Sequence, residues 1–207
     1  IFTGWVDIAL SESGIAEAIH AGKELAHIQI DCIYASSLFR TQMTAFLVMA
    51  QNLSKKMPYI RHDSKEFFSS WYEMGCEGNA TLIPMYTAWE LNERMYGQLQ
   101  AKNKQQIADI HGTEQVHLWR RSYKMTPPEG ESLEMTAMRS IPFFKNKIIK
   151  ELEKGCTVLV CAHGNSLRSL VMEIEHLTSD QVLKLEIPTA IPIIYEFRQN
   201  SFEKVGL

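Results

Sequence analysis

Two places in the sequence combine polar side chains with a change from strand to helix. The stretch from Ser36 to Arg40 follows a β-rich run and enters a helix, with the arginine in the first helical turn. The stretch from Ala162 to Ser166 follows a nearly continuous apolar run and also leads into a helix. In parallel sheets, ligands bind beyond the carboxyl ends of the strands, where helix N-termini offer free N–H groups and partial positive charge. The two junctions therefore predict a binding site for an anion.

His163 is the titratable group at the second junction. An imidazole can act as an acid, a base, a nucleophile or a hydrogen-bond donor to a phosphoryl group. Gly164 leaves room for a ligand oxygen to approach the backbone. The alternative is that Asn165 or Ser166 only caps a helix and that His163 is a partly buried polar residue. The position at a strand end favours a functional role.

Three further groups add charge or donors. The planar guanidinium groups of Arg120–Arg121 match the geometry of carboxylates and phosphates, although adjacent arginines are more often solvated or salt-bridged. Glu93 can carry a proton if its neighbours tune it, although a glutamate beside Arg94 is more often half of an ion pair. Thr3–Gly4 offers a hydroxyl and an open backbone N–H, or simply a turn.

Composition excludes several classes of function. The 207 residues carry 21 basic and 24 acidic side chains, so the basic excess of a general nucleic-acid binder is absent. No apolar run reaches the roughly 18 residues of a membrane span. The cysteines show neither C-x-x-C pairing nor zinc spacing, which indicates a reducing compartment such as the cytoplasm and no metal site. They are Cys32, Cys76, Cys156 and Cys161. Cys32 and Cys161 lie in apolar runs and are expected to be buried.

The pattern of elements predicts an α/β fold in one domain over residues 1–207. Strands and helices alternate, which is typical of a three-layer sandwich with a mostly parallel central sheet and helices on both faces. Segment 63–88 lacks a clear period and is expected to run over the surface. Pro142 is expected to kink the longest helix, and Ser36 or Ser37 to cap the helix that follows them. We expect helices at 11–27, 38–51, 132–154 and 166–176, two short helices within 104–123 broken near Gly112, and strands at 30–35, 58–61, 157–162 and 192–197.

Taken in order, several blocks of the sequence resemble the cofactor-dependent (2,3-bisphosphoglycerate-dependent) phosphoglycerate mutases of the histidine phosphatase superfamily. The blocks span almost the whole chain and are concordant in order, which makes the resemblance specific. They are Phe2-Thr3-Gly4-Trp5, Leu10-Ser11 with Gly14, Tyr34 to Arg40, Leu91 to Arg94, Trp119-Arg120-Arg121, Pro127-Pro128 with Gly130 to Leu133, Ala162 to Arg168 and Ile187-Pro188-Thr189.

The resemblance implies an isomerase that interconverts 3-phosphoglycerate and 2-phosphoglycerate in glycolysis and gluconeogenesis. It implies a phosphohistidine, 2,3-bisphosphoglycerate as primer and intermediate, no metal, and commonly a dimer or tetramer. Glu93 would be the general acid/base and His163 would stabilise phosphoryl transfer. The groups that would bind the phosphates and the carboxylate are Thr3, Gly4, Arg40, Arg94, Met95, Tyr96, Lys104, Arg120, Arg121, Gly164 and Asn165.

The sequence departs from the family pattern at three points. The phosphorylated histidine of the family lies in an Arg-His-Gly motif upstream of Phe2, so we expect the first strand to be missing and this chain alone to be inactive. Met95 replaces a usual histidine, and the usual C-terminal tail is not present beyond Leu207. Two alternatives stay open: a phosphatase of the same superfamily, and a catalytically dead module that binds phosphorylated metabolites.

Overall fold

The core of the protein is a parallel sheet of four strands, seen in a computed structural model that describes residues 1–61 and 79–206. The strands are β1 (Cys32–Ser36), β2 (Met57–Arg61), β3 (Leu82–Ala88) and β4 (Val158–Cys161). They lie in the order β2-β3-β1-β4, and every neighbouring pair is parallel. All five residues of β1 are buried, as expected of a strand covered on both faces.

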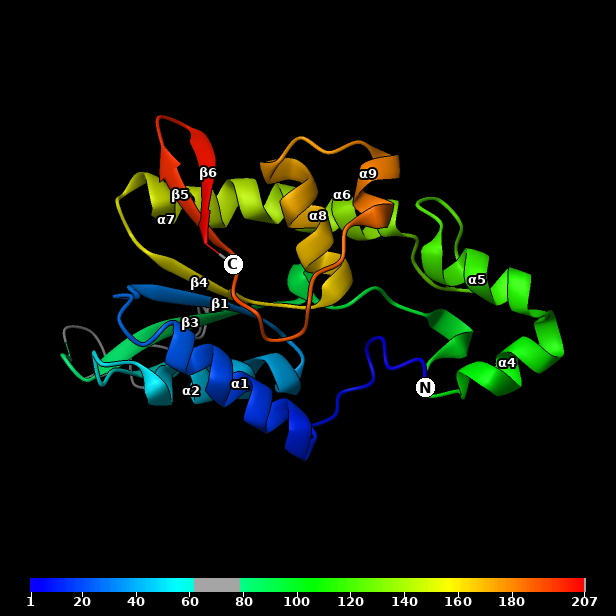
Figure 1. Cartoon of the computed structure of the whole chain (residues 1–207), viewed down its shortest axis with the longest axis horizontal. Helices are drawn as coiled ribbons and strands as arrows, with labels where there is room; N and C mark the ends of the chain where they lie inside the picture. Colours follow the sequence, from blue (N-terminus) through cyan, green and yellow to red (C-terminus); the bar gives the residue numbers. More distant parts are fainter. Residues whose placement is uncertain (62–78, 207) are drawn as a thin grey trace, which may run out of the picture.

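Helices cover both faces of this sheet, which confirms the predicted three-layer arrangement (Figure 1). The helices α1 (Glu12–Glu24) and α2 (Phe39–Gln51) lie on one face. On the other face lie α6 (Leu133–Phe143), α7 (Ile149–Glu153) and α8 (Gly164–Ile174). Helices α1 and α2 approach closely at Gly22, where a Cβ atom would lie 2.9 Å from the Val48 backbone.

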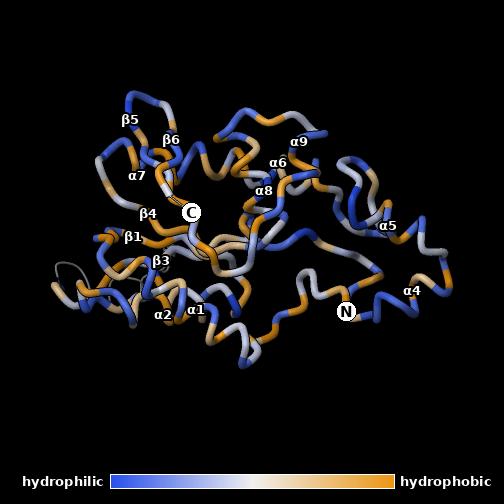
Figure 2. The backbone as a smooth tube through the Cα atoms, viewed as in Figure 1, coloured by the Kyte–Doolittle hydropathy of each residue, from blue (hydrophilic) through white to orange (hydrophobic). Residues whose placement is uncertain are grey.

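Successive residues of β1 supply two separate cores, because side chains alternate across a strand. Ile33 and Ala35 pack with Ala45 and Met49 of α2. Cys32 and Tyr34 face the opposite layer, where they cluster with Phe144, Ile148 and Leu170. Cys161 is also buried, so both cysteines predicted to be buried are confirmed. Figure 2 shows the hydrophobic residues that follow β1 and β4 between the helical layers.

The predicted helix from 132 to 154 is confirmed as one helical run from Leu133 to Glu153, with a π-helical stretch inside it. Its N-cap Ser132 accepts a hydrogen bond from the Met135 N–H, and α6 then runs to Phe143. A five-residue π-helical segment, η3 (Phe144–Ile148), follows Pro142 and leads into α7. Pro142 lies inside this helical run and, lacking an N–H, cannot donate to the preceding turn. Gly155, at φ +84°, follows the helix as expected.

A separate group of short elements extends from the sheet towards the right of Figure 1. The 3₁₀ turns η1 (Trp89–Leu91) and η2 (Gly97–Leu99) precede α4 (Lys104–His111) and α5 (Thr113–Arg121). Gly112, at φ +85°, separates the two helices and confirms the predicted break. The chain then returns to α6.

The sequence predictions of local structure contain three errors: one sheet strand was placed on the surface, two elements near the C-terminus were not predicted, and the cap of α2 was assigned wrongly. Segment 63–88 was expected to run over the surface, but residues 82–88 form β3 inside the sheet. The alternation that buries Ile83 and Met85 is obscured in the sequence by Pro84 and by the mixed polarity of the segment. The remainder of that prediction, and Cys76, fall in 62–78, outside the described residues. The strand predicted at 192–197 is β5 (Ile194–Arg198), which pairs antiparallel with β6 (Ser201–Gly206) in a second sheet. Helix α9 (Ser179–Lys184) and β6 were not predicted.

The third error concerns the start of α2. Its N-cap is Leu38, which makes no side-chain capping hydrogen bond. Asp7, on the N-terminal segment, accepts the first helical N–H from Phe39 at 2.7 Å. Ser36 Oγ accepts the N–H of the N-cap residue Leu38 at 3.1 Å and also bonds to His163, so it caps no N–H of the helix itself. Within the described residues, no helix is both long and apolar enough to cross a membrane.

Candidate active site

A cavity of about 670 Å³ opens beyond the carboxyl ends of the parallel strands. Its walls come from the N-terminal segment, the first turns of α1, α2 and α8, the loop after η1, and the segment Ile187–Ala190. Both predicted strand-to-helix junctions therefore contribute to one hollow. The predicted site residues that line it are Thr3, Gly4, Arg40, Glu93, Tyr96, Lys104, His163 and Gly164.

His163 is the N-cap of α8 and is 8 % exposed. Its Nε2 lies 2.8 Å from the Ser36 hydroxyl, which lies 2.7 Å from the Thr41 hydroxyl. Thr41 donates its one proton to the Leu38 carbonyl at 2.9 Å, so it accepts from Ser36, and Ser36 accepts from His163 Nε2–H. The chain of hydroxyls thus fixes one tautomer of the ring.

Burial, with the nearby charges of Arg40 and Arg139, lowers the pKa of His163 to about 3. The imidazole of His163 is therefore neutral at physiological pH. An anion in the cavity would offset the two arginine charges and favour the protonated ring. This dependence is what a group that stabilises a transferring phosphoryl group requires.

Glu93 lines the cavity together with His163, from a loop that follows η1. Its Oε1 accepts hydrogen bonds from the Arg94 N–H at 2.7 Å and from Asn165 Nδ2 at 2.5 Å. Its Oε2 lies 4.0 Å from the position that a Cβ on Gly164 would occupy. Asn165, predicted as a binding residue, thus orients the carboxylate, and the missing side chain of Gly164 keeps the space beside Oε2 open.

Arg40 connects the first turn of α2 to the N-terminal segment. Its guanidinium donates to the Gly4 carbonyl at 2.8 Å and to the Val6 carbonyl at 3.0 Å. Burial lowers its pKa, while the charges of Glu93 and Asp7 act in the opposite direction. At Gly4, φ is +48°, and a Cβ would lie 2.6 Å from Gln100 Oε1. Glycine is therefore required where the chain bends over Arg40.

Two predicted residues lie behind the cavity wall. Arg94 is 1 % exposed and donates to the Tyr96 hydroxyl and to the Arg120 carbonyl, so it supports its neighbours. The Met95 backbone is engaged by Glu131, which accepts from its N–H and donates to its carbonyl. The structure therefore does not bring Arg94 and Met95 to the cavity with the other predicted residues.

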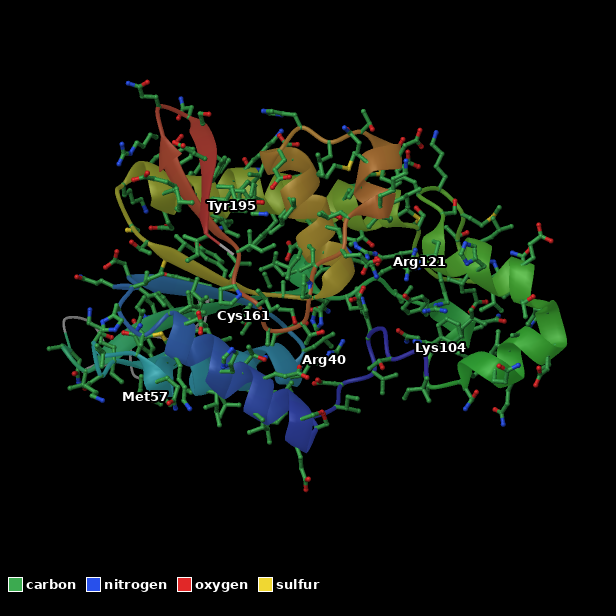
Figure 3. The ribbon with its side chains drawn as sticks, in the orientation of Figure 1. Arg40, Met57, Lys104, Arg121, Cys161 and Tyr195 are labelled. Atoms are coloured by element: carbon green, nitrogen blue, oxygen red, sulfur yellow. The ribbon has the colours of Figure 1, made fainter. Side chains whose placement is uncertain are left out.

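Arg120 and Arg121 end α5 near the cavity, without lining it. Figure 3 shows Arg40, Lys104 and Arg121 on three different elements, α2, α4 and α5. Burial, then the charges of Arg120 and Arg121, lower the pKa of Lys104, so the three cations are electrostatically coupled. Arg121 is exposed and lies 3.6 Å from Glu186 Oε1. Of the side chains predicted to lie around one anion site, Arg40, Glu93 and His163 therefore line the cavity, whereas Arg120 and Arg121 lie outside its lining.

Sequence reasoning missed the residues that hold the site from behind. The Ser36 hydroxyl bonds His163 and the Thr41 hydroxyl bonds Ser36, while Asn92 accepts hydrogen bonds from the Ser37 N–H and hydroxyl. Glu131 and Arg139 bind the loop that carries Glu93. Glu131 belongs to a block that resembles the family, whereas Arg139 lies in an ordinary amphipathic helix that gives no signal. Among the described residues, no cluster of His, Cys, Asp and Glu could hold a metal ion.

Solved structures with the same fold include Bacillus stearothermophilus YhfR, at a TM-score of 0.75 and 21% identity, covering 99% of this chain and 87% of that one. The alpha-ribazole phosphatase of Shigella flexneri matches at a TM-score of 0.72 and 18% identity, over 100% of this chain and 87% of the other. At these identities the likeness establishes the fold.

Sequence relatives are much closer. The chain is 50% identical over 205 residues to the 2,3-bisphosphoglycerate-dependent phosphoglycerate mutase of Protochlamydia amoebophila, covering 99% of this chain and 91% of that protein. It is 49% identical over 207 residues to 2,3-bisphosphoglycerate-dependent phosphoglycerate mutase 1 of Arabidopsis thaliana, covering 100% and 62%. The model of the histidine phosphatase superfamily (branch 1) matches residues 1–65 and 76–207. The chain therefore belongs to the 2,3-bisphosphoglycerate-dependent phosphoglycerate mutases of the histidine phosphatase superfamily.

Proposed function

We propose that the protein interconverts 3-phosphoglycerate and 2-phosphoglycerate, in glycolysis and gluconeogenesis. The observation that carries the proposal is the meeting of Glu93 and His163 in one cavity with Arg40 and Lys104. The high identity to named mutases over the whole chain supports the same conclusion. In this role 2,3-bisphosphoglycerate supplies the phosphoryl group that primes the enzyme.

The cations and the open backbone of the site serve to bind the anionic substrate. Phosphoryl transfer depends on positioning and on donors aimed at the equatorial oxygens, and arginine and histidine can provide these without a metal. Arg40, Lys104, Thr3 and the α8 N-terminus at Gly164 line the cavity and would hold a phosphoryl group. Arg120 and Arg121, beside Lys104, would hold the second anionic end of the substrate.

Glu93 is the group that would exchange a proton with the substrate hydroxyl. A hydroxyl oxygen must lose its proton as it accepts a phosphoryl group and regain it when the group leaves. Oε1 of Glu93 is occupied by two donors, and Oε2 adjoins the space left open at Gly164. The geometry therefore points Oε2 at the substrate, on the same cavity wall as the ring that would stabilise the transferring group.

The nucleophile is the part of the proposal that rests on family resemblance. The sequence from Ile1 to Leu207 contains no Arg-His-Gly, the motif in which relatives carry the phosphorylated histidine. We propose that turnover requires a nucleophilic histidine carried by such a motif.

The test is an isomerase assay on protein that carries the Arg-His-Gly segment ahead of Ile1. The protein is primed with 2,3-bisphosphoglycerate and given 3-phosphoglycerate, and formation of 2-phosphoglycerate and of free phosphate is followed. Isomer formation in excess of phosphate release supports the mutase. Release of phosphate faster than isomer formation favours a phosphatase of the same superfamily, and binding without turnover favours a metabolite-binding module.

Further properties follow from the same proposal. We propose a single domain that works in the cytoplasm, needs no metal, and acts on small phosphorylated acids. The cysteine pattern and the net charge of −3 support a reducing compartment and argue against nucleic acid as a partner. A homodimer or homotetramer is proposed from family resemblance.

A further inference from the structure

Arg139, on α6, uses every donor of its guanidinium on the loop that carries Glu93 and on one carboxylate. Its Nε donates to Glu131 Oε1 and its Nη2 to Glu131 Oε2, both at 2.9 Å. Nη2 also donates to the Glu93 carbonyl at 3.0 Å, and Nη1 donates to the carbonyls of Trp89 and Glu90. Arginine has five N–H donors, so this fork is saturated.

Glu131 completes the arrangement from the other side of the loop. Its Oε2 accepts the Met95 N–H at 3.0 Å, and its own N–H donates to the Met95 carbonyl at 2.8 Å. The two side chains are 7 % and 13 % exposed for Arg139 and Glu131. A buried bidentate pair of this kind has one favourable geometry, and each partner needs the other.

Two aromatic rings enclose the guanidinium. Its Cζ lies 5.6 Å from the ring centre of Trp5 and 5.9 Å from that of Trp89. The indole N–H of Trp5 donates to the same Glu93 carbonyl that Arg139 binds, at 2.5 Å. The Glu93 carbonyl is therefore bound by Arg139 and Trp5, neither of which lines the cavity.

We propose that Arg139 and Glu131 are positioning residues for Glu93, which set the placement of its carboxylate through the backbone of residues 89–95. This inference rests on the proposed function, because its consequence is a rate. A displacement of about 1 Å at a reacting group can cost about a hundred-fold in rate. Substrate binding depends on other residues, so the turnover number should fall while KM stays nearly unchanged.

Arg139→Lys is the sharpest variant, because lysine keeps the positive charge that acts on His163 but lacks the planar fork. In protein that carries the Arg-His-Gly segment, we expect kcat to fall by about ten- to a hundred-fold with KM within about two-fold of wild type. Glu131→Gln should show the same split. The matched control is Glu134→Gln, three residues along and paired with Lys124 at the surface, which should leave both parameters unchanged.

The outcomes separate this proposal from the proposed function. A wild-type protein without isomerase activity contradicts the function. The positioning role is overturned if the wild type is active and the folded Arg139→Lys and Glu131→Gln variants keep a normal kcat. It is also overturned if these variants change KM alone.

A measurement on the wild-type protein decides the case in which the variants do not fold. Hydrogen exchange of the Met95 amide and of the Trp5 indole, followed by NMR, should be at least about a hundred-fold slower than in an unstructured peptide. Exchange near the unstructured rate would show that the loop is not held and would overturn the proposal.

Discussion

Glu93 lines the cavity, Arg121 lies outside its lining, and the two side chains are held in opposite ways. The main chain of Glu93 is bound by Arg139 and Trp5, and its carboxylate by Asn165 and by a backbone N–H. Arg121 is exposed at the end of a short helix, where Glu186 Oε1 lies 3.6 Å from its Nη1. The group proposed to exchange a proton is therefore held by several hydrogen bonds, while the group proposed to recognise an anion is held by one exposed ion pair.

The comparison has a physical basis. Proton transfer depends on the relative placement of atoms to a fraction of an ångström, and buried hydrogen bonds supply that placement. Attraction between an arginine and an anion falls off slowly with distance and tolerates a mobile side chain. Rigid catalytic groups and exposed recognition groups are therefore compatible within one site.

The largest expected effect is at Glu93. In protein that carries the Arg-His-Gly segment, Glu93→Gln should lower kcat by about a hundred- to ten-thousand-fold, since it removes the proposed acid/base and keeps the shape. Steady-state kinetics with 3-phosphoglycerate checks this. A kcat within about three-fold of wild type would show that Glu93 takes no part in the chemistry. The hydrogen bonds that hold Glu93 in place would then have no catalytic explanation.

Arg121→Met should act on binding instead. Loss of one charge-assisted hydrogen bond to the substrate should weaken binding by about ten- to a hundred-fold at low salt, with the fold intact. Calorimetric titration with 3-phosphoglycerate at two salt concentrations measures this, with circular dichroism as the check on folding. Unchanged affinity would exclude Arg121 from the site.

Ser36→Ala tests the support behind His163. The variant leaves the buried Nε2–H without its acceptor, and we expect kcat to fall about ten-fold with little change in KM. Thr41→Val breaks the same chain one step further away and should have a smaller effect, which Thr41→Ser should restore. The ¹⁵N shifts of the imidazole report the tautomer directly; a wild-type ring with its proton on Nδ1 would contradict the assignment.

The pH dependence of stability gives a further check on His163. Its pKa is about 3 in the folded chain against 6.5 for the free side chain, so the unfolded state binds the proton more readily. The contribution of His163 is therefore present above pH 6.5 and is lost as the pH falls towards 3. Denaturant unfolding of wild type and of His163→Gln between these values should show a shallower fall in the variant. Parallel curves would mean that the ring is protonated in the folded state.

The smallest effect is expected at Glu186. This exposed carboxylate lies near Arg121 and 3.9 Å from Arg168 Nη2, and exposed pairs contribute about 0–1 kcal/mol. Glu186→Gln should therefore tighten 3-phosphoglycerate binding by at most about five-fold, because the arginines lose a competing anion. Weaker binding in the variant would show that Glu186 orders the arginines for the substrate instead.

The parts of the site that depend on a few neighbouring residues could be predicted from the sequence. The junctions at Ser36 and His163 were predicted because a strand end and a helix start are readable over a few residues. The strand at 82–88 was missed because Pro84 interrupts an otherwise regular alternation. Its identity as a sheet strand depends on pairing with β1 and β2, which are distant in sequence.

The residues that support the site could not be found in this way. Arg139 binds carbonyls 46 to 50 residues away, and Ser36 binds a ring 127 residues away. Each is an ordinary residue in its own segment, and only the packed fold shows what it touches. The family resemblance named residues that line the cavity, together with Arg94 and Met95 behind its wall, and gave no role to Ser36 or Arg139.

A double-mutant cycle between Arg139→Lys and Arg121→Met tests the contrast between the rigidly held Glu93 and the exposed Arg121 most directly. With kcat and KM measured in one assay, Arg139→Lys should lower kcat alone and Arg121→Met should raise KM. Because the two residues share no partner, the double variant should combine both changes, with kcat/KM within about two-fold of the product of the single effects. Two variants that alter the same parameter, or whose combined effect is far from that product, would contradict the account.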